Sequence, residues 1–124
     1  MAIYLTRRCL RNVKKMQLQD HQLQKAAAEV LAGRYDADLG GGVIKKRIAV
    51  TGGKRGGARF ILFFRRQETL FFYDGWMKAD VSGKGAKEIE DDELDAYKIM
   101  AKTYLSWDAG QIQKLLDAGM LIEV

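Results

Sequence analysis

Three runs of β-branched and aromatic residues constrain the fold of this chain more than any other feature. They are "VIKKRIAV" at residues 43–50, "ARFILFFRR" at residues 58–66 and "TLFFYDGWMK" at residues 69–78, and no proline interrupts them. Runs of this composition and length are typical of β-strands. The glycine-rich "TGGKRGG" and the short "QE" join them, so the sequence predicts an antiparallel meander.

Helical periodicity precedes these strands. Cys9, Val13 and Met16 recur at helical spacing, and cations occupy the other side of that helix. A second helix is expected from an N-cap at Asp20 to a stop at Gly33. Together the two helices predict a helical hairpin, and residues 2–5 predict a short strand before it.

The remaining segments complete the expected fold. The glycines of "DADLGGGV", residues 36–43, predict a loop. The acidic residues from Glu88 begin a C-terminal helix, and Ser106 or Asp108 caps another. The expected class is α+β: an N-terminal helical hairpin packed on a small antiparallel β-sheet, with additional C-terminal helices. The 124 residues fit a single domain spanning residues 1–124.

Composition excludes several kinds of chemistry. A single cysteine, Cys9, excludes an internal disulfide and a multi-cysteine metal site. The one histidine, His21, excludes a ribonuclease that uses a histidine pair and a metal centre held by several histidines. We therefore expect no metal and no cofactor. The longest apolar runs are far shorter than the roughly 20 residues that span a bilayer, so we expect a cytoplasmic protein without membrane contact.

Charge is distributed unevenly along the chain. The net charge is +5, and residues 40–67 hold eight basic residues and no acidic one, whereas most acidic residues follow residue 87. Concentrated cations beside aromatic residues favour a polyanionic partner, above all nucleic acid. The alternative is a solvated basic surface without a partner.

Strand alternation predicts which face these cations occupy. Lys45 and Arg47 project to one side of their strand, and Lys46 projects to the opposite, more apolar side, which should meet the helices. We expect Lys45 and Arg47 on the open face, where Arg59 of the next strand can join them outside the core. Lys46 is expected to snorkel from the sheet edge.

The ordered set "GGVIKKRIAV", "GKRGGARFILFF" and "FFYDGWMKAD" resembles the core of the RelE/HigB branch of bacterial toxin–antitoxin toxins. The resemblance implies a RelE-like α+β fold and a toxin that enters the A site of the 70S ribosome, contacts 16S rRNA and cuts mRNA without metal. It also implies a cognate antitoxin, HigA-like or RelB-like, from the same operon.

The resemblance also implies roles for individual residues. It assigns proton transfer and phosphate binding to Lys45 and Arg47, transition-state stabilisation to Arg59, and a catalytic position at the strand end to Lys78. Ala79 stands where RelE-like toxins have an arginine, and the catalytic tyrosine of some members has no clear counterpart. The residues expected to bind RNA are Lys46, Lys54, Arg55, Arg65, Arg66 and Trp76.

Several alternatives stay open from the sequence. The loop with Lys54 and Arg55 could contact ribosomal RNA or be a structural turn, and Trp76 and Phe63 could stack on bases or lie in the core. The whole chain could instead be a ParE-like gyrase inhibitor, or a non-catalytic nucleic-acid-binding protein that follows phosphates.

Overall fold

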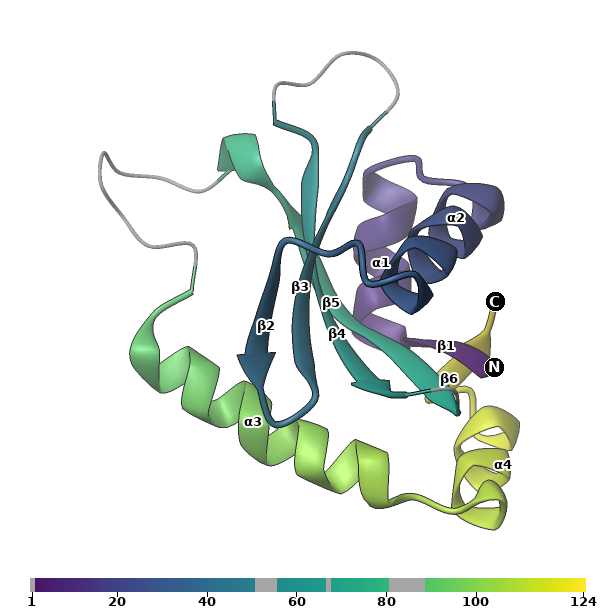
Figure 1. Cartoon of the computed structure of the whole chain (residues 1–124). Helices are drawn as coiled ribbons and strands as arrows, with labels where there is room; N and C mark the ends of the chain where they lie inside the picture. The colour runs from purple at the N-terminus through teal and green to yellow at the C-terminus, as the bar shows by residue number, and fades with distance from the viewer. Residues whose placement is uncertain (1, 51–55, 67, 81–88) are drawn as a thin grey trace.

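One six-stranded mixed β-sheet organises the chain (Figure 1). The computed structural model describes residues 2–50, 56–66, 68–80 and 89–124. The strand order is β2-β3-β4-β5-β1-β6, and every neighbouring pair is antiparallel except β1 and β5, which are parallel. The strands are β1 (Ala2–Thr6), β2 (Ala37–Gly40), β3 (Val43–Ile48), β4 (Ala58–Arg65), β5 (Thr69–Met77) and β6 (Leu121–Glu123).

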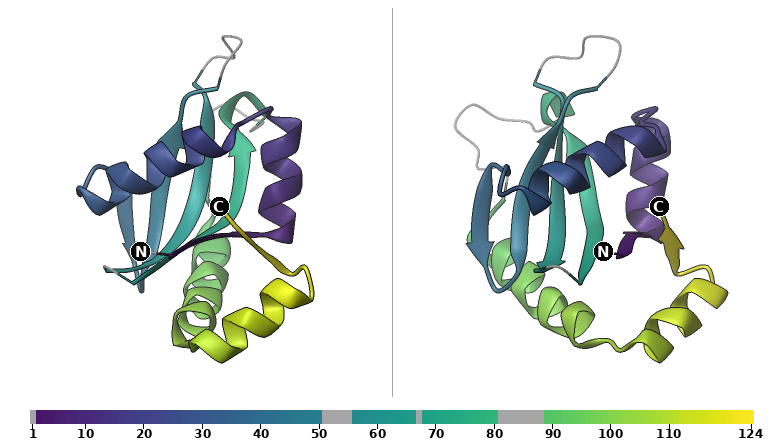
Figure 2. Two further views of the ribbon diagram at one scale, coloured as in Figure 1. Left: turned by 90° about the vertical axis from the view of Figure 1, so that its right-hand side faces the viewer. Right: turned by 45° about the vertical axis from the view of Figure 1, so that its right-hand side comes forward.

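Helices cover both faces of this sheet (Figure 2). On one face, α1 (Arg7–Lys15) lies against β5 and β1, and α2 (Asp20–Leu31) lies against β3. On the other face, α3 (Asp91–Ser106) lies against β4 and β3, and α4 (Ala109–Asp117) contacts β6. A short 3-10 helix, η1 (Lys78–Asp80), follows β5. Among the described residues, no helix combines the length and the apolar character needed to cross a bilayer.

The α+β class is confirmed, but the expected arrangement is wrong. The sheet is larger and mixed, because β1 inserts parallel to β5 and carries β6 on its other side. The first two helices diverge over different strands instead of pairing as a hairpin, and the longest helix, α3, is C-terminal (Figure 2). The expected loop at residues 36–43 contains strand β2. These features depend on pairing between distant segments, which local composition does not reveal.

Helix ends follow the sequence only in part. Gln19 is the N-cap of α2, so Asp20 is the first helical residue and not the cap. Asp108 caps α4, and its carboxylate accepts a hydrogen bond of 2.8 Å from the Gln111 N–H. Thr6 caps α1, a role that the sequence did not suggest.

An aromatic cluster joins α3 to the sheet. The rings of Phe63 and Tyr73 stack at 4.5 Å, and Tyr97 and Tyr104 of α3 meet Tyr73 edge-on at 5.8 and 5.5 Å. Burial beneath the helix, with a smaller effect from the Asp74 carboxylate, raises the pKa of Tyr97 to about 12. Burial raises the pKa of Tyr73 and Tyr104 as well. These rings therefore favour the neutral phenol in the folded state.

We predict that alkaline pH weakens the packing of α3. A folded-state pKa above the unfolded value of Tyr97 means that the unfolded state releases its proton first. Stability should therefore be retained below pH 10 and fall as the pH rises from about 10 to about 12. Tyr97→Phe removes this contribution, so urea unfolding at pH 9 and pH 11 should show a smaller loss for the variant than for the parent. Equal losses would contradict the burial of Tyr97 by the sheet.

Candidate functional site

Three of the four cations expected to act in catalysis lie at one end of the sheet, and Lys45 lies further along β3, where it pairs with Ile61. We call Lys45, Arg47, Arg59 and Lys78 the cationic row. Arg47 of β3 pairs directly with Arg59 of β4, which pairs on its other side with Trp76 of β5. Directly paired residues of neighbouring strands project to the same face, and Lys45 shares that face because it precedes Arg47 by two positions. Lys78 follows the end of β5.

Gly56 and Gly57 bring two members of the row together. The guanidinium of Arg59 donates a short hydrogen bond to the Gly56 carbonyl, and the Lys78 N–H donates to the Gly57 carbonyl at 3.1 Å. A Cβ added to Gly56 would lie 3.0 Å from Cδ of Lys78, so the lysine stem lies over this glycine. Both glycines have positive φ, 80° and 61°, a conformation that other residues rarely adopt. Gly56 and Gly57 therefore position Arg59 and Lys78 next to each other.

The members of the row differ in exposure. The Arg47 side chain is 60% exposed and Lys78 is exposed, whereas Lys45 is half-buried. Arg59 is only 2% exposed, so the expectation that it lies outside the core is wrong. Arg47 and Lys78 are therefore the accessible cations of the row, and Arg59 lies below the surface.

Asp36 is a residue of this site that sequence reasoning missed. Its carboxylate accepts a hydrogen bond from the Arg47 N–H and lies 4.0 Å from Nε of the same arginine. The Asp36 N–H in turn donates to the Lys45 carbonyl at 3.0 Å. Asp36 thus restrains Arg47 and offsets part of its charge. No local motif marks this residue, because its contact depends on the unexpected pairing of β2 with β3.

The residues expected to bind RNA are dispersed. Lys46 is 8% exposed on the opposite face, where its Nζ lies 3.6 Å from the Glu29 carboxylate of α2. Arg65 and Arg66 are exposed near the other end of β4, about 20 Å from Arg59 along the strand. Arg65 pairs there with Glu68.

Two further expectations concern aromatic residues and the glycine-rich loop. Trp76 is half-buried against the second core, and its Nε1 is buried without a hydrogen-bond partner among the described residues. Phe63 is fully buried, so it belongs to the core. Lys54 and Arg55 lie outside the described residues.

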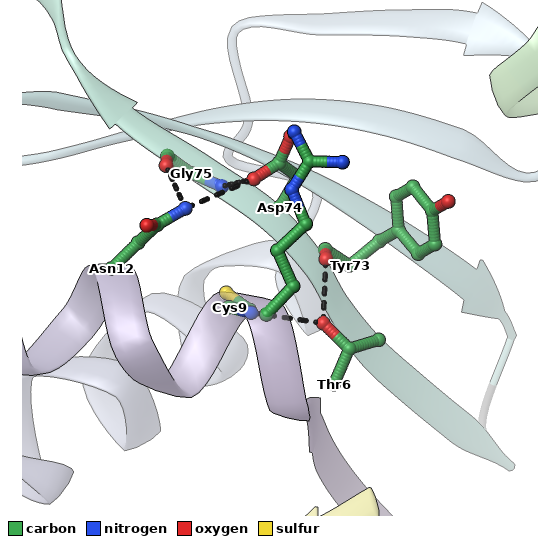
Figure 3. A network of polar contacts seen from close by, with 7 residues as sticks. Thr6, Cys9, Asn12, Tyr73, Asp74 and Gly75 are labelled. Carbon is green, nitrogen blue, oxygen red and sulfur yellow. Dashed lines mark hydrogen bonds and ion pairs between the residues drawn. The ribbon is translucent and has the colours of Figure 1, made fainter. Parts of the chain in front are cut away.

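A polar network fixes the end of β5, where Trp76 lies just before Lys78 of η1 (Figure 3). The Asp74 carboxylate accepts hydrogen bonds from the Asn12 amide at 3.1 Å and the Gly75 N–H at 2.8 Å, and it lies 3.3 Å from the Arg8 guanidinium. The Asn12 amide also donates to the Gly75 carbonyl at 2.9 Å. The pairing of β4 with β5 shifts register between Ile61 and Leu62. Because of this bulge, Asp74 meets α1 although Trp76, two positions later, packs against the second core.

The network includes the start of α1 as well. The Thr6 hydroxyl donates to the Tyr73 carbonyl at 2.6 Å and accepts from the Cys9 N–H at 3.1 Å (Figure 3). Burial, helped by the nearby Asp74 carboxylate, raises the pKa of the Cys9 thiol far above its ordinary value. Cys9 is therefore a packing residue and not a nucleophile.

These features define a small α+β protein with a cluster of cations at one end of its sheet. Among the described residues, no group of histidine, cysteine, aspartate and glutamate side chains could hold a metal ion. The arrangement can bind and polarise phosphate groups through guanidinium and ammonium hydrogen bonds.

Comparison with known families identifies the chain more closely. Residues 1–124 match the family described as the RelE toxin of the RelE/RelB toxin–antitoxin system. The chain therefore belongs to this family of toxins, whose partner is an antitoxin of the RelB kind. Comparison with individual curated proteins gave no match.

We predict that Gly57→Ala destabilises the site more than Gly33→Ala. Both glycines have positive φ, but a Cβ at Gly57 would also lie 2.6 Å from the Ile48 carbonyl oxygen, whereas a Cβ at Gly33 would meet nothing within 4 Å. We expect Gly33→Ala to lower the free energy of unfolding by about 1–2 kcal/mol and Gly57→Ala by about 2–4 kcal/mol. Urea unfolding measures both, and equal costs would contradict the close approach of Gly57 to β3.

We also predict that Asp74→Ala lowers the free energy of unfolding by about 2–4 kcal/mol, because it leaves buried donors without their acceptor. Asp95→Ala is the matched control, since Asp95 is an exposed carboxylate of α3, and its effect should stay within about 0.5 kcal/mol. Similar costs for the two variants would show that the network does not hold α1 to β5.

Proposed function

We propose that this toxin is a ribosome-dependent endoribonuclease that cuts mRNA in the A site of the 70S ribosome and thereby inhibits translation. The observation that carries the proposal is the pairing of Arg47 with Arg59 across β3 and β4, with Lys78 packed over Gly56 beside them. Membership of the RelE family supports the same assignment.

The proposed reaction is attack of an mRNA 2′-hydroxyl on the adjacent phosphate. A bond forms between the 2′-oxygen and phosphorus, and the bond from phosphorus to the 5′-oxygen breaks. The 2′-hydroxyl loses a proton and the leaving 5′-oxygen gains one, which yields a 2′,3′-cyclic phosphate and a 5′-hydroxyl. The crowded phosphate carries additional negative charge in the transition state, so cations aimed at it accelerate the reaction.

The residues of the cationic row suit different parts of this reaction. Arginine keeps its proton in proteins, so Arg47 and Arg59 would bind phosphate and stabilise charge. Lysine can donate and accept protons, so Lys45 and Lys78 would take part in proton transfer. The only histidine, His21, lies in α2 on the opposite face of the sheet, so imidazole would take no part.

An antitoxin from the same operon would silence the toxin by covering the cationic row. An acidic segment would complement the charge of Arg47 and Lys78, which are exposed in the chain alone. RNA and antitoxin would then compete for one surface.

We predict that Arg47→Ala slows cleavage of mRNA on purified ribosomes about 100-fold, because one preorganised donor to the transition state is lost. Arg65→Ala is the matched control: Arg65 is also an exposed arginine with one surface ion pair, but it lies at the other end of the sheet. Its effect should stay within about threefold, as expected for a surface cation outside the site. Cleavage is measured by mapping new 5′ ends of the messenger over time.

Two results would contradict this function. Intact messengers during growth arrest by the parent toxin would exclude mRNA cleavage, and inhibition of DNA supercoiling by purified gyrase would then identify a ParE-like activity. Equal losses for Arg47→Ala and Arg65→Ala would show that the cationic row is not the site.

A further inference from the structure

The exposed side of α1 carries a second set of cations, distinct from the cationic row. Arg7, Arg11, Lys14 and Lys15 are all exposed, and we call them the α1 basic face. The buried side of the helix holds Cys9 and Val13. The helix lies on the sheet face opposite to α3 and the second core (Figure 2). The cationic row and the α1 basic face therefore lie on different sides of the molecule.

The helix dipole accounts for Lys14 and Lys15, which stand in the last turn of α1, but folding does not explain the positive charge of Arg7 and Arg11. Arg7 occupies the first turn, where the helix dipole disfavours positive charge, and that turn contains no acidic residue. Arg11 has Arg7 and Lys15 four positions away, and such like-charged pairs repel one another along the helix. In the described part of the chain, no carboxylate forms an ion pair with any residue of the α1 basic face. Neutral polar side chains at these positions would keep this face of α1 hydrated without the repulsion between like charges.

The spacing of these cations along α1 is suited to binding a charged polymer. Arg7, Arg11 and Lys15 repeat every four residues, so they form a stripe with a rise of about 6 Å per step. Arg8, which lies beside this stripe, is already engaged by Asp74. Successive phosphates of one nucleic acid strand present charges along a similar line, and lysine or arginine can neutralise each of them.

We propose that the α1 basic face binds the phosphate backbone of duplex RNA, as a second RNA contact separate from the cationic row. The proposal rests on the proposed function in one respect, that the polyanion met by this toxin is RNA. Ribosomal RNA helices present such a backbone wherever the toxin acts. Contact on two sides of the molecule would orient the cationic row relative to the messenger.

The side chains of α1 favour RNA over an acidic protein segment. Protein interfaces are depleted in lysine, and where arginine is enriched in them it accompanies aromatic anchors. The exposed side of α1 offers only arginine and lysine, whereas the large exposed apolar residues among those described are Leu31, Ile99 and Met120, on other elements. Phosphate binding requires no apolar anchor.

The test compares two variants of equal charge. The first is Arg7→Gln, Arg11→Gln, Lys15→Gln, and the control, Lys98→Gln, Lys102→Gln, Lys114→Gln, removes three exposed lysines of α3 and α4. Binding of each protein to a fluorescein-labelled RNA duplex is measured by anisotropy over a range of salt concentrations. We expect the first variant to bind at least about tenfold more weakly, with a salt slope lower by about two to three, and the control to bind within about twofold of the parent.

Further measurements separate folding, protein binding and cleavage. The charge-retaining variant Arg7→Lys, Arg11→Lys, Lys15→Arg should keep the affinity of the parent, and the glutamine variant should unfold at no lower temperature. Equal weakening by the glutamine variant and its control would overturn the proposal. Loss of co-purification with the antitoxin while duplex binding persists would overturn it in favour of a protein partner. Duplex binding needs no cleavage, so this result is independent of whether the parent cuts mRNA.

Discussion

The Asp74 carboxylate is the contact on which the arrangement of this molecule depends. It joins α1 to β5 through Asn12 and Arg8, at the bulge where the alternation of β5 changes. Without that change, Trp76 could not pack against the second core while Asp74 meets the helix. A buried carboxylate is costly unless its oxygens are satisfied, so the amide and guanidinium partners explain why an acidic residue is tolerated at 6% exposure. One helix and one strand end are thereby held together: the α1 basic face lies on that helix, and Lys78 of the cationic row follows that strand.

Acidic and basic residues are concentrated on different elements of the molecule. Acidic residues begin α3, where the helix dipole favours them, and the other side of that helix places tyrosines on the sheet. Basic residues are concentrated on the exposed side of α1 and in the cationic row, although α3 and α4 also carry the exposed Lys98, Lys102 and Lys114. A polyanion bound by the cationic row, as proposed, would be repelled by the acidic start of α3, which would restrict its orientations.

Local sequence patterns predict the elements that depend on neighbouring residues. They do not predict the elements that depend on pairing between distant segments. Strands β3, β4 and β5 follow from apolar runs and glycine turns, and alternation correctly placed Lys45 and Arg47 on the face opposite to Lys46. Strands β2 and β6, of four and three residues, are too short to produce a pattern, and the parallel pairing of β1 with β5 joins segments more than 60 residues apart. The contact of Asp36 with Arg47 depends on the pairing of β2 with β3, so local sequence patterns do not reveal it. Alternation along β4 predicts which face of the sheet Arg59 occupies. It does not predict how deeply Arg59 is buried, because burial depends on the segments that pack over the strand.

The burial of Arg59 bears on how the proposed reaction would be assisted. A guanidinium in water must shed hydration before it can contact phosphate closely, but Arg59 has already lost that hydration on folding and donates to the Gly56 carbonyl instead. Electrostatic attraction is stronger in such surroundings than in water, because the effective dielectric constant is lower. A phosphate in contact with Arg59 would therefore gain more free energy than one in contact with the exposed Arg47. The exposed Arg47 and Lys78 would supply binding free energy, and part of it would be used to bring the phosphate into contact with Arg59, so tight RNA binding would be coupled to use of the most effective cation.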